Sequence, residues 1–97
     1  MAKANKLSDD DVAKALGDLS GWQRDGDAIV KEVRFGGFGE AIAFVVRLAM
    51  RAEVADHHPD IDIRYSRVRV ALSTHSEGGI TDKDVALAGE AEAIAGG

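Results

Sequence analysis

Apolar residues recur every three or four positions in three stretches of the chain, a pattern that predicts three amphipathic helices. Two of these helices open on a hydroxyl residue that is followed three positions later by an aspartate, Ser8 with Asp11 and Thr81 with Asp84. This spacing is typical of a capping box, in which each partner satisfies a backbone N–H of the first turn. The first helix is expected to end at Gly21 and the last at the terminal glycines.

The middle helix, expected over residues 38–56, is apolar around most of its girth. Such a helix is buried on more than one side. We therefore expect it to pack on a sheet and on either another helix or another subunit. Pro59 disfavours helical angles at the residue before it, so the helix should end just before the adjacent histidines His57 and His58.

Alternation of apolar and polar residues predicts two β-hairpins. The first joins residues 22–25 to residues 29–35 through an Asp-Gly-Asp turn, and the second joins residues 61–65 to residues 68–72. The apolar positions change parity between the last two strands, which places a tight turn near residues 66–67.

The elements follow the order α-β-β-α-β-β-α, which predicts an α+β fold: a four-stranded antiparallel sheet with three helices packed on one face. The 97 residues suit a single domain over residues 1–97, and the polar residues 1–6 are expected to be disordered. Four short strands leave open edges, and pairing of such an edge with another copy predicts a homo-oligomer.

Charge and composition narrow the classes of function. The formal net charge is −5, with 17 acidic against 12 basic residues, which disfavours binding to nucleic acid. The most apolar stretch, residues 41–50, contains Arg47 and falls short of the about 20 residues that cross a bilayer. The chain has no cysteine and no apolar leader, so we expect a cytoplasmic protein without disulfides.

The histidines are the main candidates for chemistry. His57 and His58 lie where a helix gives way to an extended segment, and His75 lies where a strand ends. Side chains at the ends of elements often meet in clefts, and imidazole exchanges protons near neutral pH. Two other interpretations stay open: solvated loop residues, and a zinc site, which adjacent histidines pointing in different directions disfavour.

Three carboxylates accompany these histidines. Glu53 lies one helical turn before His57 and could orient that imidazole, although it could equally be an ordinary surface charge. Asp56, at the expected end of the helix, is similarly ambiguous. Asp84 is already accounted for by its capping box.

Taken together, these residues resemble the motifs of the pterin-4a-carbinolamine dehydratase family, whose members also serve as dimerisation cofactor of a homeodomain transcription factor. Residues 53–59, Glu-Val-Ala-Asp-His-His-Pro, resemble the family's acid-x-x-x-His-His-Pro motif. Tyr65, the His75 of Leu-Ser-Thr-His and Asp84 stand at the family's spacing. The motifs span residues 53–84, and looser likeness covers nearly the whole chain. Ile61 and Asp62 depart from the aromatic residues that some members carry there.

The resemblance implies a hydro-lyase that removes water from a 4a-hydroxytetrahydropterin to give a quinonoid dihydropterin, in tetrahydrobiopterin recycling, with no cofactor and no metal. It implies His57 and His75 as the proton-transfer pair and His58 as mainly a substrate-binding group. The other site residues, which would bind or orient, are Glu53, Asp56, Pro59 and Asp84. The expected partners are the pterin and further copies in a homodimer or homotetramer, with no nucleic acid and no membrane. The alternative is a non-catalytic assembly or coactivator module on the same fold.

Overall fold

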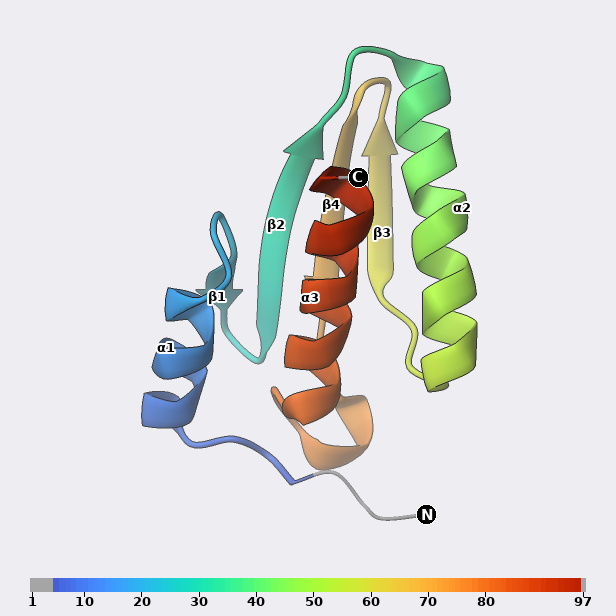
Figure 1. Ribbon diagram of the computed structural model, residues 1–97. Coiled ribbons are helices and arrows are strands. Elements are labelled where there is room, and N and C mark those ends of the chain that lie inside the picture. The colour runs from blue at the N-terminus through green and yellow to red at the C-terminus, as the bar shows by residue number, and fades with distance from the viewer. Residues whose placement is uncertain (1–4, 97) are drawn as a thin grey trace.

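The chain was analysed as a computed structural model, which describes residues 5–96 (Figure 1). Its elements follow the order expected from the sequence pattern, with one short 3-10 helix added before the last α-helix. They are α1 (Asp9–Gly17), β1 (Gln23–Asp25), β2 (Ala28–Arg34), α2 (Phe38–Ala55), β3 (Asp60–Arg64), β4 (Arg67–Leu72), η1 (His75–Glu77) and α3 (Asp82–Gly96).

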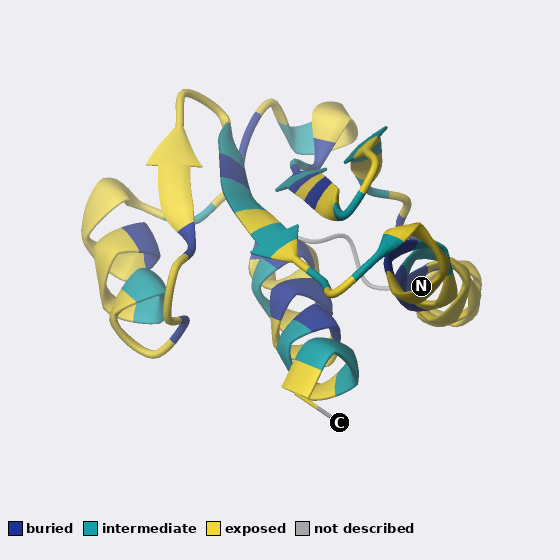
Figure 2. Cartoon of the chain, turned by 90° about the horizontal axis from the view of Figure 1, so that it is seen from above, coloured by how far each residue is buried: buried dark blue, intermediate teal, exposed yellow. Residues whose placement is uncertain are grey.

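The strands form one antiparallel sheet in the order β1-β2-β4-β3. The two predicted hairpins meet where β2 pairs with β4, in a register that places Ile29 opposite Leu72 and Val33 opposite Val68. Figure 2, which looks down on the molecule, shows the three helices on one side of this sheet. The predicted α+β architecture is therefore confirmed, and it leaves β1 and β3 as the edge strands.

The core lies between the sheet and the helices. Strand β4 buries alternate residues, as a strand with one covered face should. Helix α2 buries a stripe with helical spacing, and α3 covers the middle of the sheet. The buried apolar residues of these three elements are Val68, Val70 and Leu72; Ala41, Phe44, Leu48 and Ala52; and Leu87, Ala88 and Ala91. The edge of this core nearest the start of α3 is where the candidate site forms.

The start of α1 agrees with the prediction, but its end does not. Ser8 Oγ accepts from the backbone N of Asp11 at 3.1 Å, which satisfies one free N–H of the first turn. The helix ends at Gly17 rather than Gly21. The next residues form tighter turns, with Leu19 N donating to Leu16 O at 3.1 Å. Leu19, which the apolar pattern placed on the same stripe as Val12 and Leu16, is buried in the core although it lies outside the helix.

Lys31 interrupts the apolar face of β2, and the structure shows how its charge is satisfied. Its Nζ donates to Ser20 O at 2.9 Å and pairs with Glu92 of α3. The same Glu92 accepts from Trp22 Nε1 at 2.8 Å. One carboxylate thus links the first hairpin to α3, so the lysine does not leave a charge unpaired at the core boundary.

The expectation about the start of the chain needs correction in part. Residues 1–6 were expected to be disordered, and residues 1–4 lie outside the described part of the chain. Lys6, however, forms an antiparallel bridge with Thr81, and Leu7 N donates to Ile80 O at 2.8 Å. These backbone bonds hold the segment against the start of α3.

The outward face of α2 remains apolar. The helix packs on the sheet and on α3, as expected, but Val46 and Met50 on its other side are 49% and 65% exposed, and Val54 near its end is 89% exposed. Packing within one chain therefore explains only part of the apolar surface that the sequence places around α2. Among residues 5–96, no helix is both long enough and apolar enough to cross a membrane.

The turn between β3 and β4 lies at residues 65–66, one position before the predicted place, and it holds Tyr65 at a φ of 53°. A bulky residue in the left-handed region is strained by its Cβ. We expect Tyr65→Gly to raise the free energy of unfolding by about 0.5–1 kcal/mol, since the side chain is 71% exposed and buries little. Urea denaturation measures this change.

The matched control is Ser66→Gly in the same turn, where the native φ is not positive. That change should lower stability by about 0.5–1 kcal/mol, because glycine only adds freedom to the unfolded chain. Equal effects of the two substitutions would contradict a conformational cause.

Candidate active site

The three histidines line one cleft of about 290 Å³ at the end of the sheet nearest the start of α3. His57 and His58 come from the segment after α2, and His75 comes from the first residue of η1, directly after the last strand. The residues lining the cleft are Asp56, His57, His58, Ser73, Thr74, His75, Ser76 and Lys83. Residues distant in sequence are thus brought to one surface, as expected of His57, His58 and His75.

A left-handed residue ends α2 and directs the chain into the cleft. Asp56 has φ 50° and ψ 44°, its N–H bonds to Glu53 O, and His57 N donates to Ala52 O at 3.0 Å. This pair of bonds is the Schellman motif, which reverses the chain at the end of a helix. The helix therefore ends just before His57, as predicted, with the reversal at Asp56 and with Pro59 in the extended segment that follows.

His57 is buried and pairs with a buried carboxylate. The residue is 8% exposed, and its Nε2 lies 2.5 Å from Oδ1 of Asp84, which is fully buried in the first turn of α3. Asp84 therefore does more than cap the helix, which was the role that its local spacing to Thr81 indicated. A carboxylate bonded to one ring nitrogen fixes the orientation of an imidazole and the position of its proton.

The second oxygen of Asp84 is also fully occupied. Oδ2 accepts from the backbone N of Thr81 at 2.8 Å, which is the predicted capping bond, and from Thr74 Oγ1 at 2.8 Å. Thr74 Oγ1 in turn lies 2.7 Å from Thr81 Oγ1. Oδ2 already accepts from two donors, which indicates that the carboxyl group of Asp84 is ionised and accepts at both oxygens. His57 Nε2 is then the donor to Oδ1.

The proton on His57 is therefore assigned from the network to Nε2. The other ring nitrogen, Nδ1, carries the lone pair and is the atom of His57 that can accept a proton from a molecule in the cleft. This arrangement suits a general base whose direction is set by a buried partner.

Glu53 was expected to orient His57, and the structure pairs it with His58 instead. His58 Nε2 lies 2.5 Å from Glu53 Oε1. The side chains of both residues are more than half exposed. An ion pair this accessible to water contributes little, about 0–1 kcal/mol. Glu53 can thus bias the position of His58 only weakly.

His75 is exposed and stands on a short turn that backbone bonds hold in place. Thr74 N donates to Gly79 O at 2.8 Å, and Gly78 N donates to His75 O at 3.1 Å. Gly78 adopts a φ of 69°, which lets the chain close this turn without steric cost. The imidazole is thereby presented at the rim of the cleft.

Of the remaining residues, Asp56 lines the cleft, whereas Pro59 is half-buried and does not. Lys83 and Ser76 line it and were not singled out from the sequence. Lys83 directly precedes Asp84, so its position in the first turn of the last helix could have indicated it. Ser76 lies in a predicted polar loop, where no local signal separates a cleft residue from a solvated one.

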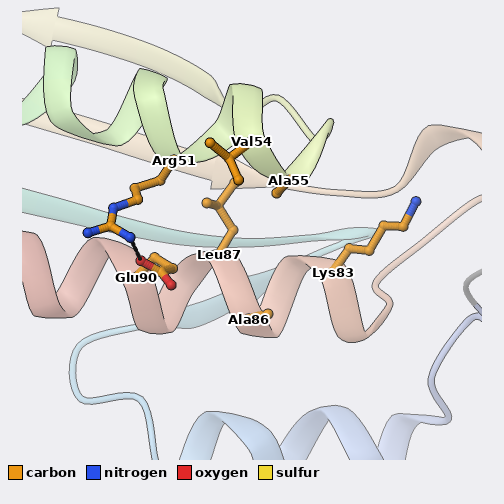
Figure 3. Close-up of a pocket in the computed structure, with 7 residues that line it drawn as sticks. All are labelled: Arg51, Val54, Ala55, Lys83, Ala86, Leu87 and Glu90. Atoms are coloured by element: carbon orange, nitrogen blue, oxygen red, sulfur yellow. Dashed lines mark ion pairs between the residues drawn. The ribbon is translucent and has the colours of Figure 1, made fainter.

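A second hollow lies between α2 and α3, beside the histidine cleft (Figure 3). It is lined mainly by Val54, Ala55, Ala86 and Leu87, and Arg51 pairs with Glu90 across it at 3.5 Å. Lys83 lines both hollows. No histidine of the described residues lines this hollow. Within residues 5–96, no cluster of three or more His, Asp or Glu side chains could hold a metal ion.

The site is a histidine-lined cleft on a small α+β fold, with one histidine bonded to a buried aspartate. A sequence model of the family described as pterin 4 alpha carbinolamine dehydratase matches residues 5–94. The chain belongs to this family, and it is a hydro-lyase by the consistent naming of its relatives at about 50% identity. The resemblance seen in the sequence is thereby confirmed.

Individual relatives agree in sequence and fold. A protein of Mycobacteroides abscessus, provisionally named pterin-4-alpha-carbinolamine dehydratase, is 56% identical over 84% of this chain and 87% of its own length. The crystal structure of a Brucella melitensis protein described as transcriptional coactivator/pterin dehydratase superimposes with a TM-score of 0.92 at 40% identity, covering 94% of this chain and 99% of that one.

A third relative carries a different description. It is a pterin dehydratase-like protein identified as a RuBisCO assembly factor in the alpha-carboxysome, with a TM-score of 0.64 at 26% identity over 77% of this chain and 87% of that one. The fold therefore also occurs in a protein with an assembly role.

Proposed function

We propose that this chain acts as one domain that dehydrates a 4a-hydroxytetrahydropterin in the cytoplasm, as a step in tetrahydrobiopterin recycling. The observation that carries the proposal is the shared cleft of His57, His58 and His75, in which a buried carboxylate positions one of the three rings. Proton transfer needs groups of this kind within reach of one small substrate.

The reaction moves two protons. As the bond between carbon 4a and its hydroxyl oxygen breaks, the lone pair of the adjacent ring nitrogen forms a C=N bond. Hydroxide is a poor leaving group, so an acid donates a proton to the oxygen and water departs. A base takes the proton from the ring nitrogen, which leaves the neutral quinonoid dihydropterin. Each positioned acid or base typically contributes about 10²–10⁴-fold to the rate.

The cleft supports a division of these roles. His57 serves as the base through Nδ1, because its Nε2–H is committed to Asp84. His75, an exposed residue of the same cleft, serves as the acid, and His58 binds the substrate with help from Asp56. Pro59 keeps the segment that carries His57 and His58 extended.

The direct test is a dehydration assay on the purified protein, together with titration by a dihydropterin. We expect turnover without added metal or cofactor, and binding that shifts the NMR signals of all three histidines. A protein that neither accelerates the dehydration nor binds the dihydropterin would overturn the proposal.

A second candidate function is a non-catalytic assembly or coactivator module, and the exposed apolar face of α2 favours it. Val46, Met50 and Val54 offer a surface that could bind another protein. One experiment distinguishes the enzyme from the binding module: the turnover of Met50→Lys is compared with that of His75→Ala. The enzyme loses turnover only with His75→Ala, whereas a pure binding module has no turnover to lose.

We also propose a homo-oligomer in which β3 pairs with β3 of a second copy. In an antiparallel register centred on Asp62, Asp60 of each copy faces Arg64 of the other and Ile61 faces Ile63, and these pairs must outweigh the repulsion between the two facing Asp62 carboxylates. Pairing would cover an open edge. Light scattering should give the mass of a dimer or tetramer, and a monomer at micromolar concentration would contradict the proposal.

A further inference from the structure

The buried cluster behind His57 contains two threonines whose protons can be assigned by counting. Thr74 and Thr81 are 5% and 0% exposed, and no buried side-chain oxygen or nitrogen of the described residues lacks a partner. Thr74 has one hydroxyl proton, and the ionised Asp84 can only accept, so that proton lies on the 2.8 Å bond to Oδ2. The 2.7 Å contact between the threonines then needs the proton of Thr81.

The direction of every bond in this cluster follows. Lys83 N donates to Thr81 Oγ1 at 3.2 Å, Thr81 Oγ1 donates to Thr74, and Thr74 donates to Asp84. A chain of donors that ends on Oδ2 holds the carboxylate in one rotation. Oδ1 is thereby left facing His57 Nε2.

We propose that Thr74 is a positioning residue, whose hydroxyl, held in turn by Thr81, fixes the carboxylate of Asp84 so that His57 keeps its proton on Nε2. Thr74 also begins the turn that carries His75, since its carbonyl accepts from Glu77 N at 3.0 Å and its N–H donates to Gly79 O at 2.8 Å. One buried residue therefore sets the direction of His57 and anchors the turn of His75. The effect on turnover rests on the proposed function, but the proton position on His57 does not.

The test is the tautomer of His57, read from long-range ¹H–¹⁵N spectra of the substrate-free protein at a pH where the ring is neutral. In Thr74→Val, which keeps the shape but loses the donor, we expect the Nε2–H to Nδ1–H ratio to fall by about fivefold or more. Dehydration should show kcat lowered about tenfold with KM within about twofold, the pattern of a lost transition-state interaction.

Two further variants separate positioning from general damage. Thr74→Ser keeps the hydroxyl and should restore both the tautomer and kcat. Thr81→Val also replaces a buried hydroxyl by a methyl group. The hydroxyl of Thr81 bonds to Thr74 and not directly to the carboxylate of Asp84. The Thr81→Val variant should lower the melting temperature yet keep the Nε2–H form, because Asp84 retains the Thr74 hydroxyl and the Thr81 N–H.

Unchanged tautomer ratios in Thr74→Val would overturn the inference, whatever happened to turnover. If Thr74→Val does not fold, Thr74→Cys, with its weak S–H donor, is measured in its place and read in the same way. If the wild-type protein shows no dehydration but the tautomer shifts as described, the proposed function fails and the inference stands.

Discussion

Asp84→Asn is expected to lower kcat by about 10³-fold while the protein stays folded. Asparagine has the shape of aspartate but carries one acceptor and one donor group. The N–H of Thr81 and the hydroxyl of Thr74 both require an acceptor, so the amide oxygen must take the place of Oδ2. The NH₂ group then faces His57 Nε2, where it can only donate.

The consequence is a change of tautomer. With a donor against it, Nε2 must hold the lone pair, and the proton of His57 moves to Nδ1. Nδ1 of His57, the nitrogen available to the substrate, then carries a proton and cannot accept another. The melting temperature should fall, because the three charge-assisted hydrogen bonds of the carboxylate become neutral ones, at a cost of about 1–3 kcal/mol in all. Steady-state kinetics and the histidine NMR spectrum measure the two effects separately.

Glu53→Gln is the matched control for that substitution. It makes the same carboxylate-to-amide change beside a histidine of the same cleft, but on the exposed pair with His58. Water can replace what the glutamate offers there, so kcat should stay within about threefold of wild type. If Asp84→Asn had as small an effect as Glu53→Gln, the positioning of His57 by Asp84 would be wrong.

The fold could be predicted from local patterns because each pattern had a direct physical cause. The helical stripes, the alternating strands and both capping pairs correspond to elements in the structure. The differences fall at the ends of helices. The first helix ends at Gly17 and gives way to tighter turns that still bury Leu19, and the reversal after α2 depends on a left-handed Asp56 that no pattern marks.

The gathering of the three histidines was predictable, but the cleft residues Ser76 and Lys83 and the carboxylate partners of His57 and His58 were not. Motif spacing singled out His57, His75 and Asp84, and tertiary structure brings all three to one corner. Spacing along a helix suggested that Glu53 pairs with His57, but the turn at Asp56 sends His57 inward to Asp84 and leaves Glu53 to His58. Because the turn at Asp56 sets the directions of His57 and His58, the periodicity of α2 does not predict which carboxylate each one meets.

Substitution of the three histidines is expected to divide them into two classes. His57→Ala and His75→Ala should each lower kcat by about 10²–10⁴-fold, because each removes a proton-transfer group. His58→Ala should mainly raise KM, with kcat nearly unchanged, because an exposed ring paired with Glu53 contributes to binding alone. Steady-state kinetics at saturating pterin separates the two outcomes.

The burial of His57 requires one more variant. Truncation to alanine leaves Oδ1 of Asp84 without its partner in a buried site, which costs about 1–3 kcal/mol of stability. His57→Gln keeps an amide N–H near the position of Nε2 and should restore stability without restoring turnover, since the amide has no basic nitrogen to stand for Nδ1. Turnover near the wild-type rate in either His57 variant would remove His57 from the reaction and leave His75 to be paired with another base.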